Sequence, residues 1–162
     1  MTSRHFSAAL LLLPQVLSLR AQNSPGAGQV TLEPPPALSV KTGETAALAL
    51  RFKLAPGHHT NSSKPSDEFL IPFKLTWDAA SLAPLEGAGI DYPAGNMEKY
   101  AFSEKPLSVY SGAFTVTARF KAPAGAAKGE RKVSGKLRYQ ACNDTMCFAP
   151  RNLAVQATIN IQ

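Results

Sequence analysis

The chain contains two cysteines, Cys142 and Cys147, and four residues separate them. The tip of a hairpin can bring two such Cα atoms within the roughly 4.4–6.8 Å that a disulfide requires. The closed ring would hold about six residues, and chain entropy gives such a ring a stabilisation of only about 2 kcal/mol. Because this is a small gain for the one disulfide that two cysteines can form, the spacing favours a redox couple first and a structural bridge second.

The expected strands place both sulfurs at a loop end of the protein. Cys142 ends one expected strand and Cys147 precedes the next. Cys142 also continues the alternation of Lys136, Arg138 and Gln140, which lies away from the apolar side chains of that strand. We therefore expect Cys142 to be accessible rather than buried, as thiol exchange requires.

Charged residues near the cysteines are few. Asp144 lies between the two sulfurs, and the nearest cations are Arg138 and Arg151. Neither thiol is therefore expected to be strongly activated. The pattern favours a disulfide that is attacked by a partner's thiolate over a self-activated oxidant. A passive hairpin disulfide in an exported protein-binding module remains the main alternative.

Alternation of apolar and polar residues runs through the chain from Val30 onward and predicts short β-strands. Thirteen prolines and eleven glycines fit a turn-rich β domain, with turns expected at 55–57, 86–89, 93–96 and 122–125. We expect an all-β, antiparallel β-sandwich in a single domain over residues 30–162, with Trp77 as a core anchor. The expected core-facing positions are Ala46, Leu48, Leu50, Phe52 and Leu54; Phe114, Val116, Ala118 and Phe120; Val133, Leu137 and Tyr139; and Leu153, Val155, Ala157, Ile159 and Ile161.

The first residues have the layout of a secretory signal peptide. Arg4 and His5 precede an apolar run at 8–17, and small or polar residues follow it. The run is shorter than the about 20 residues that span a bilayer. We expect a signal peptide over residues 1–21 and a flexible lead-in over 22–29, with an N-terminal core helix as the alternative. Export to the periplasm or a comparable space would put the cysteines where a disulfide persists.

The charge distribution argues against nucleic acid as a partner. The formal net charge of +6 falls to +4 when Arg4 and Arg20 leave with the signal peptide. The remaining Lys and Arg residues are scattered, without a basic run or a stripe of basic and aromatic residues. They predict a solvated surface.

Two adjacent histidines raise the possibility of a metal site. His58 and His59, together with Met97, Met146 and the cysteines, contain the soft donors that copper(I) prefers. Adjacent histidines after a Pro-Gly turn are more commonly solvated loop residues, which is the reading we prefer. No zinc-ligand spacing, Gly-rich phosphate loop or Ser/His/Asp set is present, so neither a cofactor nor a metal is expected.

The cysteine segment resembles a known family. Tyr139-Gln140-x-Cys142, followed by Asp144, Cys147 and Pro150, is similar to the N-terminal periplasmic domain of the thiol–disulfide interchange protein DsbD, and the segment 59–72 supports the resemblance. The similarity covers residues 30–162, although the spacer has four residues where the best-known member has five. It implies an immunoglobulin-like fold and a dithiol/disulfide pair with Tyr139, Gln140, Asp144 and Pro150 as neighbours.

The resemblance also implies a function, that of a protein thiol–disulfide oxidoreductase. Such a domain takes electrons from the thioredoxin-like module of a membrane partner and gives them to oxidised periplasmic proteins, including disulfide isomerases and thioredoxins of cytochrome c maturation. In the family an aromatic side chain of a cap loop covers the pair. The matching segment here is 97–103, with Phe102 as the first candidate and Tyr100 as the second.

Two expectations complete the prediction. Cys142 is expected to form the mixed disulfide with partners, because of its strand-end position, and Cys147 to resolve it. We also expect a stand-alone version of the module, without a transmembrane segment in the mature chain and with its electron donor on a separate chain.

Overall fold

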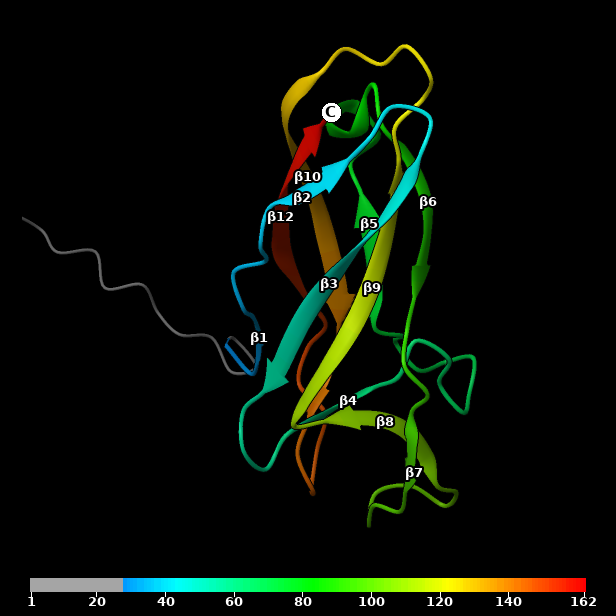
Figure 1. Cartoon of the computed structure of the whole chain (residues 1–162). Coiled ribbons are helices and arrows are strands. Elements are labelled where there is room, and N and C mark those ends of the chain that lie inside the picture. Colours follow the sequence, from blue (N-terminus) through cyan, green and yellow to red (C-terminus); the bar gives the residue numbers. More distant parts are fainter. Residues whose placement is uncertain (1–27) are drawn as a thin grey trace, which may run out of the picture.

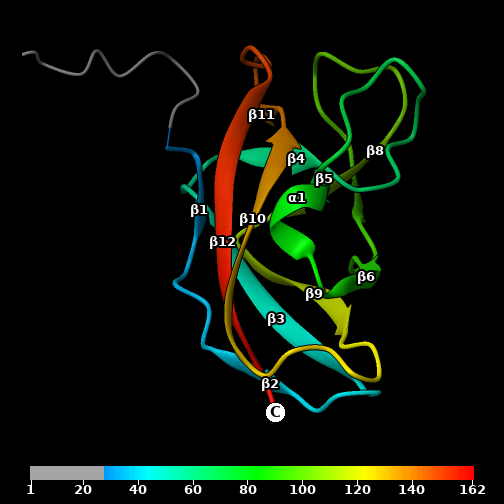
Figure 2. The same cartoon turned by 90° about the horizontal axis from the view of Figure 1, so that it is seen from above.

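The computed structural model describes residues 28–162. The expected signal peptide and residues 22–27 of the expected lead-in lie outside the described residues. Two four-stranded sheets form the two layers of an immunoglobulin-like β-sandwich, and a third, smaller sheet lies at one end (Figures 1 and 2). This confirms the predicted fold class.

The first layer has the strand order β1-β3-β9-β6, and all of its pairs are antiparallel. Its strands are β1 (Val30–Leu32), β3 (Thr45–Leu54), β9 (Ala113–Lys121) and β6 (Glu86–Asp91). The second layer has the order β2-β12-β10-β5, and β2 is parallel to β12. Its strands are β2 (Leu38–Val40), β12 (Arg151–Ile161), β10 (Gly129–Tyr139) and β5 (Lys74–Trp77).

The core lies between these two layers. Every core-facing position predicted from the alternation is either buried in one hydrophobic cluster or packs against it. Phe52, Phe73 and Phe120 are the largest fully buried side chains, and the rings of Phe52 and Phe73 meet edge to face at 5.2 Å. The period-two pattern therefore identified which side of each long strand faces inward.

Two sequence predictions about this part of the fold need correction. Residues 86–89 begin strand β6 rather than forming a turn, because the glycines lie at a bulge between Gly87 and Ile90 in an edge strand. Trp77 is only partly buried, because β5 is also at an edge of its sheet. Its indole packs against Phe120 with ring centroids 5.2 Å apart.

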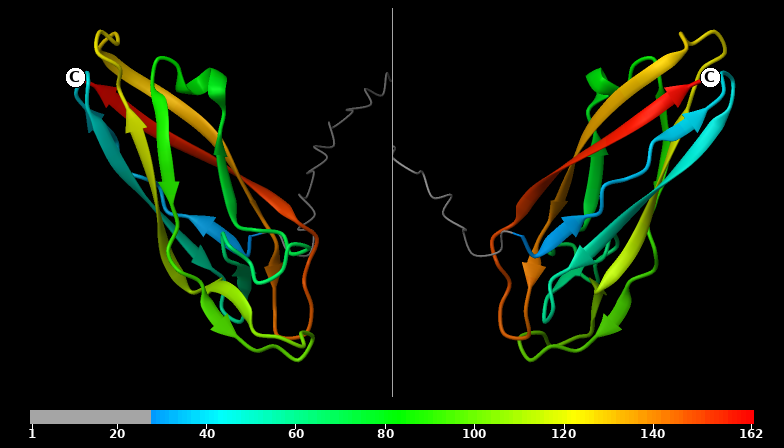
Figure 3. Two further views of the ribbon diagram at one scale, coloured as in Figure 1. Left: turned by 90° about the vertical axis from the view of Figure 1, so that its right-hand side faces the viewer. Right: turned by 60° about the vertical axis from the view of Figure 1, so that its left-hand side comes forward.

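The third sheet has the order β11-β4-β8-β7 and is built from continuations of the sandwich strands. Its strands are β11 (Ala141–Cys142), β4 (His59–Asn61), β8 (Leu107–Ser111) and β7 (Asn96–Glu98). The chain enters it from β3 through a turn at 55–58, leaves it for β9 at Gly112, and returns from β10 at Gln140. These connections gather the cysteine loop and the segment after β7 at the same end of the molecule (Figure 3).

Helical structure in the described part of the chain is limited to α1 (Ala79–Leu82), a single turn capped by the Asp78 side chain. In residues 28–162 no helix is long and apolar enough to cross a membrane.

Candidate redox site

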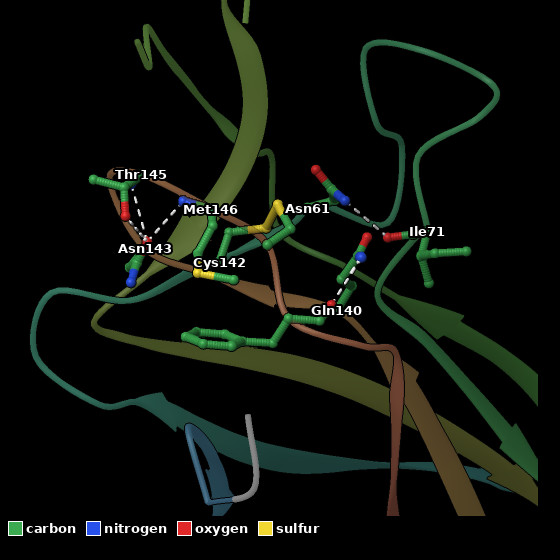
Figure 4. Close-up of a disulfide and its surroundings, with 9 residues drawn as sticks. Asn61, Ile71, Gln140, Cys142, Asn143, Thr145 and Met146 are labelled. Atoms are coloured by element: carbon green, nitrogen blue, oxygen red, sulfur yellow. Dashed lines mark hydrogen bonds between the residues drawn. A yellow bond between two sulfur atoms is a disulfide. The ribbon is translucent and has the colours of Figure 1, made fainter. Parts of the chain in front are cut away.

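Cys142 and Cys147 form a disulfide at the end of the sandwich (Figure 4). The backbone around them is a tight hairpin. The Asn143 N–H donates to the Met146 carbonyl at 2.9 Å, and the Phe148 N–H donates to the Ala141 carbonyl at 2.9 Å. The two cysteines are thereby held opposite each other in an isolated antiparallel bridge.

The Asn143 side chain organises the loop between the cysteines. Its Oδ1 accepts hydrogen bonds from the Thr145 N–H at 3.0 Å, the Thr145 hydroxyl at 3.0 Å and the Met146 N–H at 2.8 Å (Figure 4). An Asn that bonds to backbone groups two and three residues ahead is a common way to fix a tight turn. The loop geometry therefore does not depend on the disulfide alone.

The predicted accessibility of Cys142 is wrong. Cys142 is only 1% exposed, whereas Cys147 is partly exposed. Side-chain alternation holds only within one continuous strand. The chain leaves the pairing of β10 with β12 after Tyr139, and after Gln140 it pairs with β4 instead, so the alternation of Lys136 and Arg138 does not extend to Cys142.

His59 is the direct partner of Cys142 in the antiparallel pairing of β4 with β11. The expectation that both histidines are solvated is wrong for His59, which is 3% exposed, and its Nε2 has no hydrogen-bond partner. His58 remains in the preceding turn, with Nδ1 3.0 Å from the Pro56 carbonyl oxygen and its ring 5.8 Å from that of Phe148. Alternation over β4 was too short to separate the two histidines from sequence.

An aromatic side chain of the predicted cap segment covers His59, and it is Tyr100 rather than Phe102. The rings of Tyr100 and His59 stack with centroids 3.9 Å apart. Tyr100 is 9% exposed, and its hydroxyl donates to Glu98 Oε2 at 3.0 Å. Phe102 is 41% exposed and stacks on the outer side of the group, 5.4 Å from Tyr100 and 6.4 Å from His59. Tyr100, the second cap candidate, is thus the ring in closest contact with the strand partner of Cys142, and which ring shields the cysteine pair stays a prediction.

The electrostatics of the site follow from this burial. Burial lowers the pKa of His59, and the nearby carboxylates of Glu98 and Asp144 oppose the shift. Burial, together with the hydrogen bond to Glu98, raises the pKa of Tyr100 well above its usual value of 10. At neutral pH the stack therefore consists of a largely neutral imidazole and a neutral phenol.

A pocket of about 440 Å³ brings four segments together beside the disulfide loop. It is lined by the turn at 55–58, by His59, by Glu98 at the end of β7 and Tyr100 after it, and by Asp144 of the cysteine loop, together with Lys53 and Ser111. Sequence reasoning named Asp144 and Tyr100 as site residues, but it considered His59 only as a solvated residue or a copper ligand and gave Glu98 no role. These residues are distant in the chain and meet only through the pairing of the third sheet.

The remaining predicted neighbours lie in different environments. The Gln140 amide donates to the Phe148 carbonyl at 2.9 Å and so ties the start of the cysteine hairpin to its end (Figure 4). Tyr139 is buried in the main core, and that burial raises its pKa, while Arg151 acts in the opposite direction. Pro150 is exposed at the start of β12.

Of the donors suggested for copper(I), the two histidines are engaged in other contacts. His58 faces the Pro56 carbonyl and His59 stacks beneath Tyr100, while Met97 and Met146 are exposed. Within residues 28–162 no three His, Cys, Asp or Glu side chains gather as a group that could hold a metal ion.

Comparison with known proteins gives the site its context. Residues 29–158 match the family described as thiol:disulfide interchange protein DsbD, N-terminal. Among solved structures, the N-terminal periplasmic domain of ScsB from Proteus mirabilis has a TM-score of 0.51 at 15% identity, covering 79% of this chain and 44% of that chain. The N-terminal domain of Neisseria meningitidis DsbD in the reduced form has a TM-score of 0.45 at 19% identity, covering 72% of this chain and 82% of that chain. No curated protein matches the sequence.

Proposed function

The chain belongs to the family of the N-terminal domain of the thiol:disulfide interchange protein DsbD, and on that premise we propose that it relays electrons by thiol–disulfide exchange. The pair Cys142/Cys147 accepts two electrons from a thioredoxin-like donor and passes them to an oxidised protein. The observation that carries the proposal is the disulfide itself, which joins a partly exposed Cys147 to a buried Cys142 at one end of the sandwich.

This difference in exposure suggests which sulfur is attacked. A thiolate of the reduced donor attacks Sγ of Cys147, the bond between Cys147 and Cys142 breaks, and Cys142 leaves as a thiolate. The second donor thiolate then attacks the donor sulfur of the mixed disulfide and releases Cys147. The donor becomes oxidised and the pair becomes a dithiol. This order replaces the expectation that Cys142 forms the mixed disulfide.

The second half of the relay reverses these steps on another protein. Cys147, as a thiolate, attacks the disulfide of an oxidised acceptor, and one acceptor sulfur leaves as a thiolate. Cys142 then attacks Cys147 in the mixed disulfide, which releases the reduced acceptor and restores the disulfide. Two electrons have moved from donor to acceptor, and the domain is unchanged.

We place this relay in the periplasm, after removal of the signal peptide expected over residues 1–21. The electron donor is a thioredoxin-like module of a membrane protein. Oxidised disulfide isomerases and the thioredoxins of cytochrome c maturation are the acceptors. The exposed side chains of Met146 and Phe102 near the pair give such proteins an apolar surface to dock on.

The reduction potential of the pair tests the proposal. The mature protein is equilibrated in dithiothreitol buffers of graded potential, and the reduced fraction is counted by thiol labelling. A potential of roughly −180 to −270 mV, the range of exchange proteins, is expected. A potential below about −300 mV indicates a disulfide that stays closed, and the domain would then be a binding module with a structural bridge.

A further inference from the structure

The electron relay leaves one chemical problem unsolved, the fate of the negative charge on Cys142. When a partner attacks Cys147, the bond between the two sulfurs breaks and Cys142 keeps the electron pair. Cys142 is 1% exposed, so water does not solvate the thiolate that forms there. Burial in apolar surroundings raises a thiol pKa and makes it a poor leaving group. A hydrogen-bond donor inside the protein is needed.

His59 lies in the position to supply this donor. In an antiparallel pair, residues directly opposite each other have their side chains on the same face, with Cβ atoms about 4.5–5.5 Å apart. His59 and Cys142 are such a pair in β4 and β11. His59 is only 3% exposed, and its Nε2 has no hydrogen-bond partner while the disulfide is closed. A buried polar group without a partner is costly to maintain, and its persistence calls for an explanation.

The other polar groups nearby are unsuited to the task. Glu98 and Asp144 are acceptors when ionised, and the Tyr100 hydroxyl is already committed to Glu98. The Thr60 hydroxyl is also buried without a partner, but Thr60 is opposite Ala141, so its side chain lies on the other face of the sheet. His58 faces the Pro56 carbonyl in the turn. Lys53 and Ser111 also line the pocket, and both are exposed.

We propose that His59 is the acid–base partner of Cys142, holding the departing thiolate by an N–H hydrogen bond and giving it a proton. This inference rests on the proposed exchange function. The neutral imidazole donates its N–H to the new thiolate, and the negative charge then favours uptake of a proton from solvent by the His59–Cys142 pair. In the reverse step, His59 takes the proton from the Cys142 thiol as Cys142 attacks Cys147, and the imidazolium then releases that proton to solvent. The imidazole therefore ends each half-cycle neutral.

The Tyr100 stack has a defined part in this arrangement. It packs the phenol ring on the imidazole with centroids 3.9 Å apart and so helps to bury the ring that carries the unpartnered nitrogen. The site is thus arranged in advance for a charge that exists only after the disulfide opens, and such preorganised donors are worth most where water is excluded.

Variants of His59 test the inference. His59→Phe keeps a ring for the Tyr100 stack but removes the N–H, while His59→Asn keeps a donor that does not titrate. His58→Gln is the matched control at the neighbouring histidine. Each protein is checked by circular dichroism, and the rate of reduction by dithiothreitol is measured from pH 5 to 9 and divided by the thiolate concentration of the reagent.

The wild type and His58→Gln are expected to have similar rates and both to keep the inflection that titration of His59 gives to the pH profile, which loss of the His58 charge moves only slightly, toward higher pH. His59→Phe should be slower by roughly 10- to 100-fold, the worth of a hydrogen bond to a charged group. His59→Asn should keep most of the reduction rate, but its pH profile should lack the inflection that titration of His59 produces in the wild type. A second measurement uses the Cys147→Ser protein, in which Cys142 is the single thiol. Adding His59→Phe to this protein should lower the acid dissociation constant of the Cys142 thiol at least tenfold. The constant is measured from the absorbance of the thiolate.

The two proposals fail in different ways. A wild-type potential below about −300 mV overturns the relay, yet the rates and the ionisation of Cys142 still report on His59. Normal exchange by the wild type, together with an unchanged pH profile in His59→Asn, overturns the role of His59. If His59→Phe does not fold, the His59→Asn profile alone decides.

Discussion

The Tyr100 ring stacks on the His59 imidazole with centroids 3.9 Å apart, and His59 is the strand partner of Cys142. This chain of two contacts connects the segment after β7 to the sulfur chemistry at β11. We therefore propose that a docking partner opens the site by separating Tyr100 from His59. The Phe102 ring, 41% exposed, lies further out and is the first part of the segment that a partner would meet.

Removal of the Tyr100 ring should accelerate attack on the disulfide by small thiols. An aromatic stack contributes about 1 kcal/mol beyond its buried area. Tyr100→Ala should therefore speed reduction by glutathione by no more than about fivefold, because easier access is partly offset by looser positioning of the His59 donor. Phe102→Ala is the matched control and should change the rate less, because that ring is more exposed. Stopped-flow reduction kinetics measure both. A larger acceleration in Phe102→Ala would mean that Phe102, not Tyr100, shields the site.

The two cysteines should behave differently as single variants. Cys142→Ser leaves the more exposed sulfur, Cys147, and should form a stable mixed disulfide with an oxidised thioredoxin-like protein. Cys147→Ser leaves the buried Cys142 and should form little. Non-reducing gels of the mixtures give the yields, and the opposite pattern would restore Cys142 as the attacking sulfur. Both variants should stay folded, since a ring of about six residues contributes only about 2 kcal/mol.

Asn143 should stabilise the cysteine loop independently of the disulfide. Asn143→Ala removes the Oδ1 that accepts three hydrogen bonds, and it should lower the free energy of unfolding by about 1 kcal/mol. Asn152→Ala, at an exposed position of β12, is the control and should fall within about 0.5 kcal/mol of the wild type. Urea denaturation measures both. Equal stabilities for the two variants would show that the Asn143 bonds do not stabilise the fold.

The burial of His59 should make stability depend on pH. Its pKa is lowered in the folded protein, mainly by burial, from 6.5 in the unfolded chain. Above pH 6.5 the imidazole is neutral in both states, and its contribution is complete. As the pH falls below 6.5, the unfolded chain binds the proton first, so the free energy of unfolding decreases until the lower folded pKa is passed.

The contribution of His59 to this pH dependence is obtained by subtracting the free energy of unfolding of His59→Phe from that of the wild type at each pH. Urea denaturation of the wild type and of His59→Phe at pH 8, 7, 6 and 5 should give a gap that changes between pH 7 and 5, while ionisation of the carboxylates affects both proteins alike. A gap that is constant with pH would mean that His59 is as easily protonated in the folded protein as in the unfolded chain.

The sequence alone determined the sandwich. Residues such as Leu50, Val116, Val133 and Ile159 alternate with polar neighbours over long strands, and period-two alternation leaves one arrangement in which a face is buried. It also determined that the two cysteines form a close pair at a strand end, because their spacing fits a hairpin tip. The residues around the pair were sufficient to indicate the family, which the match over residues 29–158 establishes.

Only the tertiary structure decided which sulfur is buried and which ring stacks on its strand partner. The alternation of inward and outward side chains cannot be extended through Gln140. The chain exchanges β12 for β4 as its pairing partner there, so the side-chain directions in β11 do not follow from those in β10. The glycines at 86–89 carry the composition of a turn, yet they form a bulged strand because β9 pairs with them. His59, Tyr100 and Cys142 lie far apart in sequence, and the register of short strands in the third sheet brings them together. In a long strand, the alternation of apolar and polar residues shows which face is buried. A strand of two or three residues is too short to show such alternation, and its burial depends on the strands with which it pairs.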